Sequence, residues 1–287
     1  MIHRTLVSTE MLASALGAWA VVDCRFDLQQ DSWGREQYLA AHIPGAVYAS
    51  LNDDLAGDRT GTNGRHPLPP VEALAAAFGR LGIDRGTQVV VYDQDSGLFA
   101  SRLWWSLRYL GHDAVALLDG GWAKWRREER PTRSGEESRR PAVFVAAPRS
   151  DWRVDVDEVA ARMQDPGTRL VDARGPDRFE GRSETIDRVA GHIPGATNHF
   201  YKWNLGDDGT MLPPEQLRER FTRALGGHAP EQAVMYCGSG VSACHNLLAM
   251  ERAGLPGTKL YVGSWSEWSS DPSRPVETGP ATSRASS

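Results

Sequence analysis

The sequence lacks long apolar runs, which limits the compartments and partners open to the protein. Hydrophobic residues make up 40% of the 287-residue chain, yet no run approaches the roughly 20 apolar residues of a membrane-spanning helix. Residues 1–19 mix polar side chains among apolar ones and lack the continuous apolar block of a signal peptide. We therefore expect a cytoplasmic protein with no membrane partner.

Positive charge and cysteine are also scarce. The 32 basic residues are outnumbered by 37 acidic ones, and a net charge of -5 gives no basic field for binding nucleic acid. Three cysteines, an odd and small number for this length, argue against a disulfide framework. No group of cysteines and histidines has the spacing of zinc ligands, so we expect no metal site.

The sequence does contain a long internal duplication. Four blocks recur in the same order: residues 21–46 with 170–196, 68–81 with 212–225, 88–93 with 232–237, and 120–125 with 263–268. The His-Ile-Pro-Gly-Ala segment is the same in both copies of the first block. A repeat of about 145 residues is far longer than a solenoid unit and has the size of a whole domain.

Each copy has the pattern of an α/β domain. Short β-branched runs alternate with helical patterns, which favours a mostly parallel sheet flanked by helices. Apolar residues three and four positions apart follow Pro69-Pro70 and Pro213-Pro214, so both segments are predicted amphipathic helices. We assign residues 1–130 to the first domain, 131–150 to a linker and 151–287 to the second domain. Residues 269–287 are rich in Ser, Pro and Thr, and we expect them to follow the surface.

The two copies differ where a buried strand ends. The first copy has Asp93 at this position, whereas the second has Cys237, followed by Gly238, Ser239, Gly240, Val241 and Ser242. Ligand sites form at the carboxyl ends of parallel strands. Loop amides and the N-terminus of the next helix would stabilise a thiolate or a persulfide anion on Cys237. A buried inert cysteine is the alternative, but the contrast with Asp93 favours a nucleophile. We therefore expect residues 151–287 to be the catalytic domain and residues 1–130 to be an inactive one.

These motifs together resemble the tandem-domain rhodanese and mercaptopyruvate sulfurtransferase family over essentially the whole chain. The resemblance rests on Asp-Ala-Arg at 172–174, Gly-His-Ile-Pro-Gly-Ala at 191–196 and Cys-Gly-Ser-Gly-Val-Ser-Ala at 237–243. It implies two rhodanese-like domains, of which the second carries sulfur as a persulfide on Cys237. The loop residues Gly238, Ser239, Gly240, Val241 and Ser242 would then surround the sulfur.

The loop composition indicates the class of sulfur donor. Thiosulfate-type members of the family have basic residues directly after the cysteine, whereas this chain has the uncharged Gly238 and Ser239. A neutral loop suits a monoanionic thiol acid such as 3-mercaptopyruvate. The resemblance implies that Arg178 and Arg188 bind its carboxylate and keto groups, since a guanidinium binds a carboxylate through two hydrogen bonds. From the sequence alone Arg174 and Arg182 are equal candidates, although Arg174 is expected to hold the Asp-Ala-Arg turn.

The resemblance also implies a Ser-His-Asp group that handles the proton of the donor thiol. The matching residues are Ser239, His66 and Asp54, with Asp53 as an open alternative to Asp54. Other polar or aromatic residues are interpreted as structural. His42 and His192 recur in both copies and are expected to fix the turn, and the repeated tryptophans are expected to pack in cores. Cys244 is expected to lie against the core, with a resolving thiol as the alternative.

The resulting hypothesis is a two-step sulfur transfer. Cys237 takes sulfur from 3-mercaptopyruvate, releases pyruvate, and passes the sulfur to a thiol acceptor such as thioredoxin, or to cyanide, without a metal or organic cofactor. The alternatives are a thiosulfate sulfurtransferase with the same cysteine and a non-catalytic sulfur-binding protein. A cysteine phosphatase is disfavoured because Ala243 stands where its loop needs an arginine.

Overall fold

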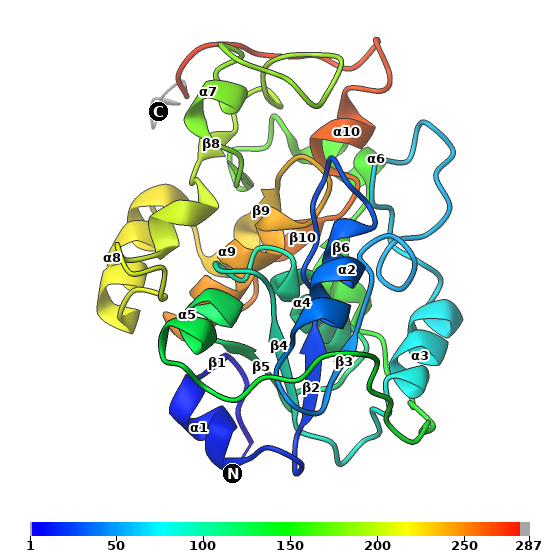
Figure 1. Cartoon of the computed structure of the whole chain (residues 1–287). Coiled ribbons are helices and arrows are strands. Elements are labelled where there is room, and N and C mark those ends of the chain that lie inside the picture. Colours follow the sequence, from blue (N-terminus) through cyan, green and yellow to red (C-terminus); the bar gives the residue numbers. More distant parts are fainter. Residues whose placement is uncertain (1, 282–287) are drawn as a thin grey trace. The chain divides into compact units, whose positions relative to one another are not determined.

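Two parallel sheets organise the described part of the chain, residues 2–281 of the computed structural model (Figure 1). The chain divides into two units. Unit 1 comprises the described residues up to Gly57, Leu68–Ser150 and Leu205–Met211, and unit 2 comprises Asp58–Pro67, Asp151–Asn204 and the described residues from Leu212. Each unit therefore includes a short segment from the other half of the sequence. His66 belongs to unit 2, although it precedes most of unit 1 in the sequence.

Unit 1 contains a sheet of five described strands in the order β1-β5-β4-β2-β3, with every neighbouring pair parallel. Its elements are β1 (Leu6–Val7), α1 (Thr9–Ser14), β2 (Ala20–Asp23), α2 (Trp33–Ala40), β3 (Ala46–Tyr48), α3 (Val71–Arg80), β4 (Val89–Tyr92), α4 (Ala100–Tyr109), β5 (Val115–Leu118) and α5 (Gly121–Arg127).

Unit 2 repeats this topology, with five described strands in the order β6-β10-β9-β7-β8, again all parallel. Its elements are β6 (Arg153–Val154), α6 (Val156–Arg162), β7 (Arg169–Asp172), α7 (Pro176–Phe179), β8 (Thr197–Asn198), α8 (Pro214–Leu225), β9 (Ala233–Tyr236), α9 (Ser242–Arg252), β10 (Lys259–Tyr261) and α10 (Ser264–Trp268), with short 3-10 turns η1 (Ser150–Trp152) at its boundary, η2 (Tyr201–Asn204) and η3 (Pro230–Gln232). The predicted α/β class with two mostly parallel sheets is confirmed.

The central strands and the predicted amphipathic helices form the cores. All four residues of β4 and all four of β9 are buried, as expected for parallel strands covered on both faces. Helix α3 buries Leu74 and Phe78, and α8 buries Leu217, Phe221 and Leu225, which are the apolar positions that the sequence spacing predicts. The period of 3.6 residues per turn places these side chains on one face of each helix.

The Asp-x-Arg pairs hold the turn that follows β2 and β7. In unit 2, Arg174 forms an ion pair of 2.7 Å with Asp172, donates to the carbonyl of Gly191 over 2.6 Å, and lies 4.8 Å from the Trp265 ring centroid. Both charged side chains are almost fully buried, so each requires the other as a partner. The predicted structural role of Arg174 is confirmed.

The repeated histidines and the segment after α10 complete this turn. The Nδ1 atom of His192 lies 2.8 Å from the Phe179 carbonyl, and that of His42 lies 2.7 Å from the Tyr38 carbonyl, in agreement with their predicted structural role. His192 also pairs through its backbone with Glu277. The predicted surface segment from residue 269 is partly or fully exposed up to residue 281, and residues 282–287 lie outside the described residues. No helix within residues 2–281 is long and apolar enough to cross a membrane.

Candidate active site

Cys237 is the first residue after β9, where the strand leads through a short loop into α9 (orange in Figure 1). Its side chain is buried, with 1% of its surface exposed. Gly240 has a φ of +73°, a left-handed conformation that glycine adopts without the strain other residues incur. The loop can therefore reverse direction within a few residues and place the cysteine next to the first turn of the helix.

The start of α10 holds the backbone of the cysteine. The N–H groups of Trp265 and Ser266 donate to the carbonyls of Cys237 and Gly238, each over 2.9 Å. The N–H of Cys237 in turn donates to the Oγ atom of Ser264 over 3.1 Å. Because both the N–H and the carbonyl of Cys237 are hydrogen-bonded, the backbone from which its side chain extends is held in place.

The equivalent loop of unit 1 contains a carboxylate instead of a thiol. Asp93 accepts hydrogen bonds of 2.7–3.2 Å from the backbone N–H groups of Asp95, Gly97, Phe99 and Ala100. Burial raises the pKa of the Asp93 carboxyl to about 6, while these N–H donors act to lower it. This position of the fold therefore offers several amides to a side-chain anion. Among the described residues no amide donates to the Cys237 sulfur, so an amide cradle around its persulfide stays a prediction.

Ser239 and His66 lie together in unit 2. The His66 Nδ1 and Ser239 Oγ atoms form a hydrogen bond of 2.8 Å, and both side chains are buried. Asp54 lies in unit 1, where its carboxylate accepts from the Ser50 N–H over 2.8 Å and pairs with Arg80 over 2.9 Å. Asp53 is exposed. The structure thus brings together two members of the expected group, and the role of Asp54 stays a prediction.

Arg178, at the end of α7, lies beside the cysteine loop. A Cβ atom built on Gly238 would lie 3.7 Å from both terminal nitrogens of Arg178. The guanidinium donates to Glu184 from Nε and pairs with Asp187 over 2.9 Å through Nη2. Although burial acts to raise it, the pKa of Glu184 is lowered by its hydrogen bonds with Arg178 and with backbone N–H groups. Two buried carboxylates therefore fix the guanidinium next to Gly238.

The other arginines of this segment have different surroundings. Arg188 is exposed, and within residues 2–281 it makes no hydrogen bond or ion pair. Its part in donor binding stays a prediction. Arg182 is also exposed and pairs with Asp177 and Glu180.

Arg65 is a candidate that sequence reasoning missed. Its Nη1 atom donates to Asp187, and its Nη2 atom would lie 2.7 Å from a Cβ atom on Gly238. Burial and the nearby Arg178 cation lower the pKa of Arg65, while the Asp187 carboxylate acts to raise it. Arg65 could have been suspected because it precedes His66 in the sequence, and a segment that places one side chain at the loop also places its neighbours nearby.

Both halves of the chain match one known protein family. The family model of the rhodanese-like domain matches residues 8–128 and, a second time, residues 155–271. The chain belongs to the rhodanese-like family. The two matches agree with the duplication in the sequence, and the expected family resemblance is confirmed.

Relatives of this rhodanese-like protein span nearly its whole length. The chain is 47% identical over 283 residues to a Pseudomonas aeruginosa protein named a probable 3-mercaptopyruvate sulfurtransferase, covering 97% of this chain and all 100% of that protein. It is 33% identical over 280 residues to the thiosulfate sulfurtransferase of Bos taurus, covering 93% of each. The structure of 3-mercaptopyruvate sulfurtransferase from Leishmania major aligns with a TM-score of 0.83 at 32% identity, over 93% of this chain and 74% of that chain.

The remaining cysteine of the second rhodanese-like unit is buried in its core. Cys244 lies on α9 with none of its surface exposed, and its thiol donates to the Gly240 carbonyl over 3.2 Å. This agrees with the expected packing role. No cluster of metal-ligating side chains is found within residues 2–281.

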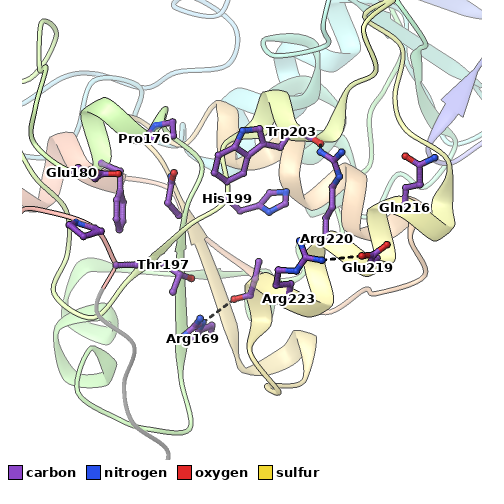
Figure 2. A pocket seen from close by; sticks show the side chains of 15 residues that line it. Arg169, Pro176, Glu180, Thr197, His199, Trp203, Gln216, Glu219, Arg220 and Arg223 are labelled. Carbon is purple, nitrogen blue, oxygen red and sulfur yellow. Dashed lines mark hydrogen bonds and ion pairs between the residues drawn. The ribbon is translucent and has the colours of Figure 1, made fainter.

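Unit 2 also has a pocket of about 840 Å³ that does not include the cysteine loop. Figure 2 shows Trp203 and His199 facing it, with Arg220 nearby; Arg223 is paired with Glu219. Burial lowers the pKa of His199 to about 4, so this imidazole is neutral near pH 7. None of the predicted catalytic residues lines this pocket, which separates it from the sulfur site.

Proposed function

We propose that this protein is a sulfurtransferase that moves the sulfur of 3-mercaptopyruvate to a thiol acceptor through a persulfide on Cys237. The observation that carries the proposal is the convergence on one loop of a strand-end cysteine, a guanidinium and a Ser-His pair. Arg178 lies next to Gly238, and Ser239 lies 2.8 Å from His66. These are the groups needed by a donor that has a carboxylate and a thiol proton.

The first half-reaction forms the persulfide. The Cys237 thiolate attacks the donor sulfur, a sulfur–sulfur bond forms, and the carbon–sulfur bond of the donor breaks. The electron pair of that bond passes to carbon as the enolate of pyruvate. The proton lost by the donor thiol moves through Ser239 and His66 and ends on this carbon. Pyruvate leaves, and the negative charge remains on the outer sulfur of Cys237.

The second half-reaction restores the enzyme. An acceptor thiolate, such as one of thioredoxin, or cyanide attacks the outer sulfur, and the sulfur–sulfur bond breaks to return the Cys237 thiolate. Because pyruvate leaves before the acceptor reacts, the kinetics should be ping-pong. Cys24, Cys237 and Cys244 are all free thiols, which supports a location in the reducing cytoplasm.

Mass spectrometry after incubation with 3-mercaptopyruvate tests the proposal. The wild-type protein should gain one sulfur atom on Cys237, and a thiol should remove it. Cys237→Ser should gain none, whereas the matched control Cys244→Ala, which changes the other buried cysteine of unit 2, should be labelled normally. Turnover by Cys237→Ser at the wild-type rate would refute the role of this thiol.

The same assay separates the alternatives. Thiosulfate is the rival donor because a thiosulfate sulfurtransferase is among the relatives, at 33% identity. A kcat/KM that is higher for thiosulfate than for 3-mercaptopyruvate would replace the proposed donor. One round of labelling without turnover, with any acceptor, would instead indicate a sulfur-binding protein.

A further inference from the structure

Two guanidinium groups share one buried carboxylate next to the cysteine loop. Arg65 donates to one oxygen of Asp187, and Arg178 pairs with the other over 2.9 Å. The Asp187 side chain is 5% exposed, whereas those of Arg65 and Arg178 are 25% and 23% exposed. The Asp187 carboxylate is therefore more deeply buried than the two guanidinium groups, which remain partly exposed and can contact a ligand.

The open side of both cations faces the residue after the nucleophile. A Cβ atom on Gly238 would lie 2.7 Å from Arg65 Nη2 and 3.7 Å from Arg178 Nη1. Neither nitrogen donates a hydrogen bond to any residue between 2 and 281, although the other nitrogens bonded to Asp187 do. Two N–H donors from different residues thus converge on a position that lacks a side chain, which is the arrangement a carboxylate needs.

The backbone of Arg65 is held by the element that also holds the cysteine loop. Its N–H donates to the Ser266 hydroxyl over 3.1 Å, and the Ser266 N–H donates to the Gly238 carbonyl over 2.9 Å. Arg65 and Gly238 are therefore connected through a single residue of α10. Its position relative to the loop follows from the fold of unit 2 and does not depend on the long side chain alone.

The surrounding charges balance without a ligand. Contacts of 2.7–3.4 Å join Asp172, Arg174, Glu184, Arg178 and Asp187, and Arg65 completes the series, giving three guanidinium groups and three carboxylates. Burial raises the pKa of Asp187, and Arg65 and Arg178 act against this shift. The charges of Arg65 and Arg178 are therefore balanced by Asp187 and Glu184, while Arg65 Nη2 and Arg178 Nη1 can still donate hydrogen bonds to a ligand.

We propose that Arg65 binds the carboxylate of the donor together with Arg178, and that Asp187 positions the two guanidinium groups side by side. The inference rests on the proposed function and deepens it by naming a second cation of the donor site. Arg65 is the donor-binding residue, and Asp187 is a positioning residue that acts through it and through Arg178.

Arg65→Gln tests the direct contact. We expect a roughly tenfold to hundredfold higher KM for 3-mercaptopyruvate and a similar rise in the inhibition constant of pyruvate, because a charge-assisted hydrogen bond is lost. The KM for the acceptor thiol should stay unchanged, which a general loss of structure would not allow. Arg65→Lys should lie between, and the exposed control Arg182→Gln should match the wild type. A wild-type donor KM in Arg65→Gln would overturn the inference.

Gly238→Ala tests the same space without removing a charge. The added methyl carbon would lie 2.7 Å from the Arg65 guanidinium, whose flexible stem can move away. We expect unchanged thermal stability and a higher donor KM. An unchanged KM would mean that this space does not hold the donor and would also overturn the inference.

Asp187→Asn tests positioning. We expect the donor KM to rise. In the double variant with Arg65→Gln, the fold-rise in donor KM should be smaller than the product of the fold-rises of the two single variants, because Asp187 acts partly through Arg65. A lower donor KM would show that Asp187 competes with the donor, and full multiplicativity would show that it acts independently of Arg65; either result overturns the positioning role. Failure of the proposed function is distinct, since wild-type Cys237 would then gain no sulfur from 3-mercaptopyruvate.

Discussion

The backbone N–H of Cys237 donates a hydrogen bond of 3.1 Å to Ser264 Oγ, and Ser264 has a left-handed backbone with a φ of +54°. The Ser264 hydroxyl also donates to the Tyr261 carbonyl over 2.8 Å. At the equivalent position, unit 1 has Gly121, with the same φ of +54°. Serine is strained in this conformation and glycine is not, so the strained residue stands in the unit that has the cysteine.

Ser264→Gly separates strain from function. The change should release roughly 1–2 kcal/mol of backbone strain. It also removes both hydrogen bonds of the Ser264 hydroxyl, which together contribute roughly 2 kcal/mol, so the free energy of unfolding should change little. The rate of persulfide formation should fall roughly tenfold, about 1.4 kcal/mol, because the Cys237 backbone loses its anchor. Stopped-flow measurement of pyruvate release, beside thermal unfolding, checks both effects. A stable variant with the wild-type rate would show that Ser264 does not assist the nucleophile.

Ser264→Ala provides the complementary measurement. Alanine keeps the strained backbone and loses both hydrogen bonds of the hydroxyl, so the free energy of unfolding should fall by about 2 kcal/mol. Its rate of persulfide formation should resemble that of Ser264→Gly. If the two variants differed in rate but not in stability, backbone flexibility rather than the hydroxyl would be the decisive property.

His66→Gln should affect the donors unequally. The contact of 2.8 Å between His66 and Ser239 offers a route for the thiol proton of 3-mercaptopyruvate. Losing this route should slow persulfide formation from that donor by roughly a hundredfold. Thiosulfate brings no thiol proton, so its slower reaction should change much less. Single-turnover rates with both donors measure the difference, and equal losses would indicate that His66 only maintains the shape of the loop.

The sequence was sufficient for the fold and for the centre of the site. The duplication predicts two α/β domains, and the contrast between Asp93 and Cys237 points to the reactive loop. Both follow from comparing the two copies of the repeat, which requires no knowledge of how distant segments pack. The resemblance to the family led to His66 and Arg178, which the structure places beside Ser239 and Gly238.

The remaining groups depend on which segments pack together. Arg65 contacts the loop because residues 58–67 belong to unit 2, an arrangement that periodicity does not reveal. Asp187 and Arg188 are adjacent in sequence, yet the side chain of Asp187 is 5% exposed and Arg188 is exposed, so their charges alone did not reveal which of them belongs to the site. Ser264 could have been noticed as the serine that replaces Gly121 in the repeat. The strain at Ser264 depends on its φ angle, which only the structure gives.

Asp93 should make the stability of unit 1 depend on pH. Its pKa in the folded protein is about 6, above the ordinary value of 3.8, so the folded state holds more protons than the unfolded chain between these limits. The stability that this proton uptake contributes is fully present below about pH 4 and is lost as the pH rises through about 6. The loss should be on the order of 3 kcal/mol, since one pKa unit corresponds to about 1.4 kcal/mol.

Asp93→Asn should remove this dependence. Urea unfolding at pH 4 and pH 7.5 should show a smaller loss of stability with rising pH in the variant than in the wild type. Asp95→Asn, in the same loop but exposed, is the matched control and should keep most of the wild-type slope. A wild-type slope in Asp93→Asn would mean that the four N–H donors, rather than burial, set the charge of this carboxylate. The loop would then hold an anion at every pH in this range, as Cys237 must when it carries sulfur.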